Sequence, residues 1–345
     1  VKILDVEGGK AGFERGVPDG ELCDVWVYEN VEVPLRVIGN SPGFEGNERA
    51  CTFDNIAPSC WKQSARLRDM SLNHIEASLC FPNSLPRFCG QTFYENADRE
   101  LGRLCIEAYN DWMIDEWCAG EGAGRLIPLT LIPLWDTELA VAEVRRCADK
   151  GSHAVSFCEN PFEIGLPSLH DSSRFWDPFF AACQETRTMV NMHIGSSSKL
   201  PTTSPDAPHA VTSVLMFQNS MSSVLDFILS GVFERFPKLT VAYSEGQIGW
   251  LPYLINRADR VWADPHDGGA GYRLPNPPST YVPGHVYGCI FDDDTALACR
   301  SLIGMDQITF EVDFPHMASS FPNTAALAVK MCEVAGPVSY THLTL

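Results

Sequence analysis

Short apolar runs alternate with helical segments along most of the chain, and this alternation limits the folds available to it. Repeated strand-helix units argue for parallel strands joined by crossover helices. Parallel strands that are buried on both faces are continuously apolar, as these runs largely are. The strand-like runs cover residues 75–81, 125–131, 153–159, 189–193, 239–244, 286–290 and 308–313.

Seven strands favour an α/β barrel of eight parallel strands whose first strand is missing or degenerate. The chain starts at Val1 rather than Met, which fits the loss of an early strand. An open doubly wound sheet is the alternative, although no Gly-x-Gly-x-x-Gly follows any strand. We expect residues 1–60 to form an irregular segment that packs on the barrel. Residues 61–336 would then form the barrel, and residues 337–345 a tail of doubtful origin.

Helices are expected between these strands. The clearest covers residues 96–118, with Asn96 as a cap. Its apolar stripe is expected to pack on a sheet and comprises Leu101, Leu104, Cys105, Ala108, Trp112 and Met113. Further helices are predicted over residues 136–150, 176–186, 213–236, 251–262 and 294–303.

Charge and cysteine content restrict the partners and the compartment. The net charge of −19 argues against a nucleic-acid partner, because such binding draws on clustered Lys and Arg. No run approaches the roughly 18 apolar residues of a membrane helix. The thirteen cysteines form no Cys-x-x-Cys pair, and Cys80, Cys158 and Cys289 lie in strand-like runs. We therefore expect a cytoplasmic protein with no membrane partner, whose cysteines are small buried hydrophobes.

Two strand ends carry metal-ligand chemistry. Run 189–193 ends in His193, and run 308–313 ends in Asp313, followed closely by His316. The carboxyl ends of barrel strands ring one pocket, so these distant residues can share one divalent ion. Alternatively, His193 is an ordinary core residue and Asp313 caps a turn. Gly195 and the three serines after it favour the ligand role, because small residues leave room beside the imidazole.

A third strand end presents Glu245. Two glycines follow it closely and let the backbone turn sharply. Glu245 is a candidate general base, metal ligand or substrate hydrogen-bond acceptor. Its alternative role is to anchor the loop by accepting backbone N–H bonds. Trp250 is a candidate substrate contact, with packing as its alternative.

Five short motifs together resemble the decarboxylase-like branch of the amidohydrolase superfamily, which includes aminocarboxymuconate-semialdehyde decarboxylase and aromatic acid decarboxylases. The resemblance spans about residues 50–335 and implies a distorted (β/α)8 TIM barrel. It further implies one divalent ion, with zinc ahead of manganese or magnesium, and a homodimer. In chain order the motifs are Asn110-Asp111-Trp112, Arg125 with Pro128 and Pro133, His193-Ile194-Gly195, the segment from Glu245 to Trp250, and Asp313-Phe314-Pro315-His316.

The family pattern is only partly matched. In the family the ion is held by a His-x-His on the first strand, a histidine on the fifth and an aspartate on the eighth; the last two match His193 and Asp313. The chain has no His-x-His, and its earliest histidine, His74, lies before a strand. Glu245 stands where characterised decarboxylases have a sixth-strand histidine. We expect that truncation removed the first strand, with a ligand-poor homologue as the alternative.

The predicted activity is metal-dependent decarboxylation or hydrolysis of a small carboxylated substrate, with aromatic acids among the candidates. Asp313 would be a metal ligand and proton shuttle, and Glu245 the acid or base. His316 would contact the ligand Asp313 or the substrate. The rival hypothesis is a catalytically inactive barrel or fragment with a binding or assembly role.

Overall fold

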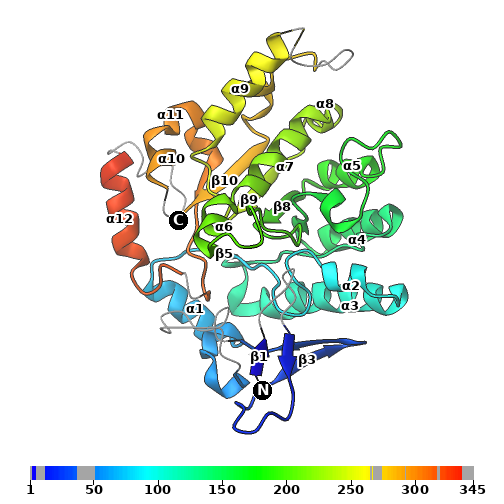
Figure 1. Cartoon of the computed structure of the whole chain (residues 1–345), viewed down its shortest axis with the longest axis vertical. Coiled ribbons are helices and arrows are strands. Elements are labelled where there is room, and N and C mark those ends of the chain that lie inside the picture. Colours follow the sequence, from blue (N-terminus) through cyan, green and yellow to red (C-terminus); the bar gives the residue numbers. More distant parts are fainter. Residues whose placement is uncertain are drawn as a thin grey trace.

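Seven short parallel strands, with helices packed around them, form the body of the protein (Figure 1). The computed structural model describes residues 2–4, 12–36, 51–264, 266, 274–291, 293–316 and 319–335. The predicted tail, residues 337–345, lies outside the described residues. So does part of the predicted N-terminal segment.

The strands are β1 (Lys2–Leu4), β2 (Gly12–Glu14), β3 (Val25–Tyr28), β4 (Val31–Pro34), β5 (Ser78–Leu79), β6 (Leu126–Ile127), β7 (Ala154–Phe157), β8 (Met189–His193), β9 (Val241–Ser244), β10 (Val286–Ile290) and β11 (Ile308–Phe310). The α-helices are α1 (Gln63–Leu72), α2 (Gln91–Glu95), α3 (Arg99–Trp112), α4 (Thr137–Asp149), α5 (Asp177–Thr186), α6 (His209–Leu215), α7 (Gln218–Leu229), α8 (Val232–Arg235), α9 (Leu251–Ala263), α10 (Asp294–Ala298), α11 (Arg300–Ile303) and α12 (Thr324–Ala335).

The strands β7 to β11 form one parallel sheet in the order of the chain. β5 and β6 form a second parallel pair. Thr130, just past β6, joins this pair to the sheet through a parallel bridge to Val155 of β7. The predicted α/β fold with seven parallel strands is confirmed.

β11 and β5 approach each other through side chains. Val312, just past β11, packs on a buried cluster that contains Leu126 of β6, and Cys80 packs on the same cluster. Within the described residues no strand pairs with the outer edge of β11 or of β5. The seven strands thus follow a barrel whose last seam is closed by packing.

The first two barrel strands are shorter than predicted. Run 75–81 contributes only Ser78–Leu79, because Ile75 ends the turn after α1 and its N–H bonds to Met70. Run 125–131 contributes only Leu126–Ile127, because Pro128 has no N–H for a strand ladder.

Two predicted helices are broken in the structure. The helix expected over residues 213–236 is divided into α6, α7 and α8. Gly231 ends its middle part with a φ of +73°, a left-handed conformation that glycine adopts without strain. The helix expected over residues 294–303 is divided at Cys299 into α10 and α11.

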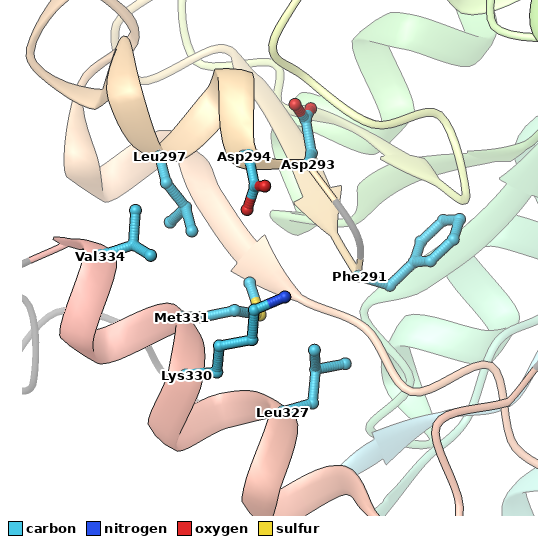
Figure 2. Close-up of a pocket in the computed structure, with 8 residues that line it drawn as sticks. All are labelled: Phe291, Asp293, Asp294, Leu297, Leu327, Lys330, Met331 and Val334. Atoms are coloured by element: carbon cyan, nitrogen blue, oxygen red, sulfur yellow. The ribbon is translucent and has the colours of Figure 1, made fainter.

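A shallow hollow of about 260 Å³, a volume that includes the solvent at its opening, lies between α10 and α12 (Figure 2). Asp294 and Leu297 line it from α10, and Lys330 and Met331 line it from α12. None of the residues that line it is a predicted site residue.

Helix α3 packs through a different face from the predicted one. Leu101, Leu104 and Trp112 are 37%, 48% and 42% exposed, so the predicted stripe is wrong for these three residues, whereas its last member, Met113, is buried. The buried residues lie at four-residue steps and are Gly102, Ile106 and Asn110. A Cβ at Gly102 would lie 3.2 Å from the Trp135 ring, so the absence of a side chain at this position favours the close approach of this face.

The cap of α3 also differs, because Asp98 rather than Asn96 accepts a backbone N–H, that of Leu101. At the other end of the helix, the Asn110 amide bonds to both the N–H and the C=O of Leu131. Asn110 also donates to Glu143 of α4, at 2.6 Å.

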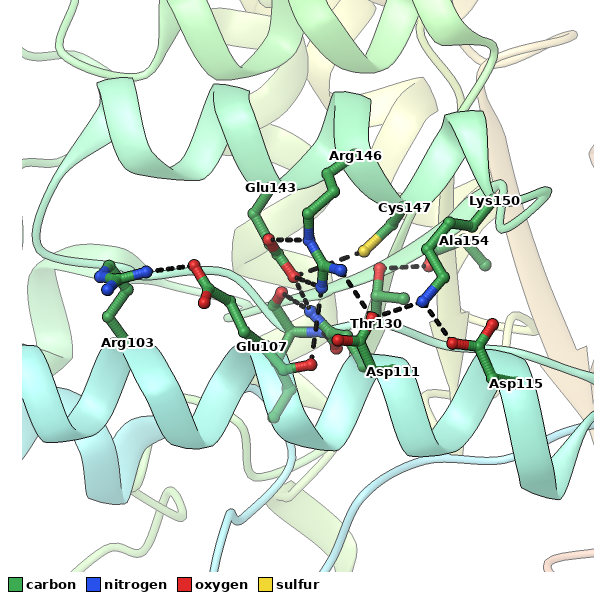
Figure 3. A network of polar contacts seen from close by, with 12 residues as sticks. Arg103, Glu107, Asp111, Asp115, Thr130, Glu143, Arg146, Cys147, Lys150 and Ala154 are labelled. Carbon is green, nitrogen blue, oxygen red and sulfur yellow. Dashed lines mark hydrogen bonds and ion pairs between the residues drawn. The ribbon is translucent and has the colours of Figure 1, made fainter.

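Ion pairs continue this contact between α3 and α4 (Figure 3). Arg146 contacts both Glu143 and Asp111, and Lys150 also contacts Asp111. The network fixes α3 against α4.

The N-terminal strands contact the barrel through Tyr28 at the end of β3. Its ring packs edge-on against Phe93 of α2, with the ring centroids 5.2 Å apart. The same buried cluster contains Ile106 and Leu131. None of the helices in the described ranges has the length and apolar content to cross a bilayer.

Candidate metal centre

Three strand ends bring two carboxylates and two imidazoles together. His193 ends β8, Glu245 directly follows β9, and Asp313 lies three residues past β11. One ligand atom each from Glu245, Asp313 and His316 lie within 4.8 Å of one another. His193 Nε2 lies 3.5 Å from Glu245 Oε2. Residues 120 positions apart in the sequence therefore share one end of the sheet.

Both carboxylates stand on unusual backbone. Glu245 has a φ of +55° and Asp313 a φ of +54°, the left-handed region that costs non-glycine residues about 1–3 kcal/mol. Glu311 holds one of these turns, because its carboxylate accepts the N–H of Glu245 at 2.7 Å. Cys289 also donates its thiol hydrogen to Glu311. Such strain persists only where the surroundings impose it.

Glu311 is not among the site residues predicted from the sequence. The available signal was an acid directly after the strand Ile308–Phe310. An acidic side chain is rarely buried at such a position unless it has a polar partner. Asp293 anchors the next part of the same loop, by accepting the N–H groups of Ile248 and Gly249. The carboxylate of Glu245 is directed instead toward His193 and Asp313.

His193 is 7% exposed and lies between two phenylalanines. Phe88 stacks on the imidazole, with the ring centroids 3.8 Å apart and the planes 9° apart. Phe81 meets it edge-on at 5.0 Å. The predicted open space beside the imidazole is therefore wrong, because Phe88 occupies one face of the ring.

The tautomer of His193 follows from its hydrogen bond. Nδ1 lies 2.8 Å from the carbonyl oxygen of Ile194. A carbonyl only accepts, so Nδ1 carries the hydrogen and Nε2 presents its lone pair on the side of Glu245. Burial lowers the pKa of His193 to about 4, so the ring is neutral near pH 7. A neutral imidazole is the form that binds metal ions.

The pKa of Glu245 is shifted in the opposite direction from that of His193. Burial and the nearby charge of Asp313 raise the pKa of Glu245 well above its usual value. The hydrogen bond to Asp313 raises the pKa of His316. A divalent cation between the carboxylates would relieve their repulsion, and oxygen and imidazole donors suit zinc or manganese. The residues present therefore fit such an ion.

The remaining predicted site residues lie at the edge of this cluster. His316 is 39% exposed and its Nδ1 lies 2.7 Å from Asp313 Oδ2. The Trp250 indole N–H donates to the Gly246 carbonyl at 2.9 Å, and Trp250 packs on the main core. A substrate contact by Trp250 stays a prediction.

Comparison with known proteins agrees with this architecture. An amidohydrolase from Mycobacterium avium subsp. paratuberculosis has a similar structure, with a TM-score of 0.67 at 19% identity, over 93% of this chain and 88% of that one. The 5-carboxyvanillate decarboxylase of Novosphingobium aromaticivorans, solved with manganese and 3-methoxy-4-hydroxy-5-nitrobenzoic acid, gives 0.62 at 18% identity, over 81% and 77%. These two similarities show the fold.

Sequence comparison reaches the family. The 2-amino-3-carboxymuconate-6-semialdehyde decarboxylase of Dictyostelium discoideum is 22% identical over 267 residues, which are 76% of this chain and 69% of that protein. The sequence model of the amidohydrolase family matches residues 28–333, most of the chain. Together with the parallel strands and the cluster at their ends, this match shows that the chain belongs to the amidohydrolase family.

Proposed function

We propose that the protein is a metal-dependent decarboxylase of a small carboxylated aromatic substrate, with hydrolysis as the second reaction type. The observation that carries the proposal is the convergence of His193, Glu245 and Asp313 at the ends of β8, β9 and β11. Both named decarboxylases among the similar proteins act on carboxylated compounds, and one was solved with manganese. These names support the substrate class.

The ion would be held by His193 Nε2 and by the carboxylate of Asp313, with Glu245 beside them as the acid. When bound, a divalent ion orients and polarises a substrate carboxylate or hydroxyl, or lowers the pKa of a water molecule. The neutral imidazole favours zinc, the ion we predict, and the manganese of the carboxyvanillate enzyme makes that metal the first alternative.

Glu245 would act as the acid in decarboxylation. The bond between the ring carbon and the carboxylate breaks, carbon dioxide leaves, and the electron pair that remains on the carbon takes a proton from Glu245. Solvent then returns a proton to Glu245. The hydrogen bond between Asp313 and the half-exposed His316 offers a route from the cluster to solvent.

Product analysis separates the two reactions. Carboxylated phenols, given with Zn²⁺ or Mn²⁺, should release carbon dioxide, whereas hydrolysis would open a ring or an amide bond. Asp313→Asn should abolish either reaction while the protein stays folded. If the wild-type protein binds neither ion and converts no substrate, the hypothesis of an inactive barrel replaces that of an enzyme.

Two further proposals concern the surroundings of the protein. We propose a homodimer, tested by light scattering after size-exclusion chromatography, and a cytoplasmic location, tested by fractionation. Cys158 and Cys289 are buried thiols, 0% and 4% exposed, which supports a reducing compartment. The net charge of −19 supports small-molecule partners over nucleic acid.

A further inference from the structure

Glu159 is a fully buried carboxyl group for which the proposed reaction has no use. It lies two residues past β7 and is 0% exposed. The N–H of Gly195 donates to its Oε2 at 3.1 Å, and the hydroxyl of Ser220 donates to its Oε1 at 2.7 Å. A buried acid survives only where specific partners compensate its lost hydration. Here the partners come from the loop after β8 and from α7.

The peptide group that Glu159 contacts is the one that orients His193. The N–H of Gly195 and the carbonyl of Ile194 belong to one planar peptide unit. That carbonyl accepts the Nδ1 hydrogen of His193, at 2.8 Å. Hydrogen bonds to the two ends of one peptide polarise each other, so the bond to Glu159 strengthens the bond to the imidazole. Gly195 permits this orientation with a φ of +82°.

In further hydrogen bonds the loop after β8 accepts instead of donating. The N–H of Glu159 donates to the hydroxyl of Ser196 at 2.9 Å, and the N–H of Asn160 donates to the hydroxyl of Ser197 at 2.8 Å. Gln91 donates to the Ser196 carbonyl at 2.8 Å. The two serines and Gln91 are at most 1% exposed. The loop is thus held by buried bonds, none of which uses the His193 ring.

Ser220 extends the connection to the neighbouring strand end. A Cβ on Gly246 would lie 2.7 Å from Ser220 Oγ, so only glycine fits beside it. Gly246 directly follows Glu245, the residue that faces His193 Nε2. The pair Glu159–Ser220 therefore contacts the backbone behind two members of the candidate metal centre.

We propose that Glu159 is a positioning residue for His193, which acts through the Ile194–Gly195 peptide to hold the imidazole as the Nδ1–H tautomer with Nε2 free to bind the ion. This inference rests on the proposed function, because it assigns His193 to the metal centre. Hydrogen-bond partners of metal-binding histidines commonly change metal affinity 10- to 100-fold when they are lost. Glu159 would reach the imidazole through one peptide group.

Ion affinity gives the first test. Titration calorimetry with Zn²⁺ and with Mn²⁺ should show 10- to 100-fold weaker binding for Glu159→Ala than for the wild type. Glu159→Gln keeps a carbonyl oxygen for the Gly195 N–H and should bind the ion with nearly wild-type affinity. The matched control is Glu143→Ala, which removes a carboxylate 5% exposed on α4 and should leave ion affinity unchanged.

The tautomer gives a second test that needs no ion. With ¹⁵N-labelled histidine, and with His193→Gln to assign the signals, the wild-type imidazole should show a protonated Nδ1 and an unprotonated Nε2. Glu159→Ala should show averaging between both tautomers, and Glu159→Gln should not. If folded Glu159→Ala keeps both the wild-type tautomer and the wild-type ion affinity, the inference is overturned. If the wild-type protein binds no ion, the proposed function fails, and the tautomer alone decides about Glu159.

Discussion

The buried, neutral state of His193 should make the stability of the protein depend on pH in a way that one substitution removes. Burial lowers the pKa of His193 from 6.5 to about 4. In the unfolded chain the ring would take up a proton below pH 6.5, whereas in the folded protein it stays neutral until about pH 4. The unfolded state therefore binds more protons in this window, and stability falls as the pH falls through it.

The magnitude follows from the two pKa values. At pH 7.5 neither state is appreciably protonated, and at pH 5.0 the unfolded ring is mostly charged while the folded ring of His193 is mostly neutral. The resulting loss of unfolding free energy between these two pH values is about 2 kcal/mol. It reaches about 3 kcal/mol once the pH lies below both pKa values.

Urea unfolding of the ion-free protein at pH 7.5 and pH 5.0 measures this loss. His193→Gln should lose about 2 kcal/mol less than the wild type over the same interval, because it has no ring to protonate. His153→Gln is the matched control, since His153 is exposed and its ring contacts the Thr186 carbonyl. Equal losses in the wild type and in His193→Gln would refute the reasoning that burial keeps this imidazole neutral.

Three further outcomes are expected. Gly288→Ala should reduce the unfolding free energy by about 1–3 kcal/mol, because its new Cβ would lie 2.7 Å from Ile248 Cδ1; unchanged urea unfolding would contradict this packing. Asn110→Ala should cost about 2 kcal/mol or more, because the buried backbone of Leu131 loses its partners, and a variant with wild-type unfolding would show that water replaces the amide. Zn²⁺ at a hundredfold excess over its dissociation constant should stabilise the protein by about 2.7 kcal/mol, measured as a rise in unfolding temperature. Asp313→Asn and chelators should abolish this rise. A rise that persists in Asp313→Asn would place the ion elsewhere.

The convergence of His193, Glu245 and Asp313 could be predicted because each stands at or just after the end of an apolar run. In parallel strands such positions meet at one edge, whatever their separation in the sequence. Barrel geometry thus converts a local pattern into a spatial one. The parallel strands β5 to β11 all lie within the runs predicted from the sequence.

The supporting residues could not be predicted in this way. Glu311 and Glu159 bond to backbone N–H groups of Glu245 and Gly195, and any residue type at a given position offers the same N–H. A sequence pattern can therefore mark an acid at a strand end, as at Glu311, but it does not show which N–H group that acid contacts. The buried face of α3 was predicted wrongly for a related reason. Gly102 is buried because it allows a close approach, and Asn110 is buried because its amide forms hydrogen bonds, so neither is marked by apolarity.

Because β11 and β5 are joined by side-chain packing, the described barrel strands form an open arc rather than a closed ring of hydrogen-bonded strands. Backbone pairing does not join its two ends within the described residues, so side chains resist their separation. Phe88, from the chain beyond β5, lies against His193 of β8, in the middle of the arc. The hydroxyl of Ser156 in β7 donates to the Phe88 carbonyl, so Phe88 is held to the strand beside His193 rather than to the seam. Separation of β11 from β5 would therefore leave the stack of Phe88 on the imidazole in place, and His193 would stay shielded from water while the seam opens.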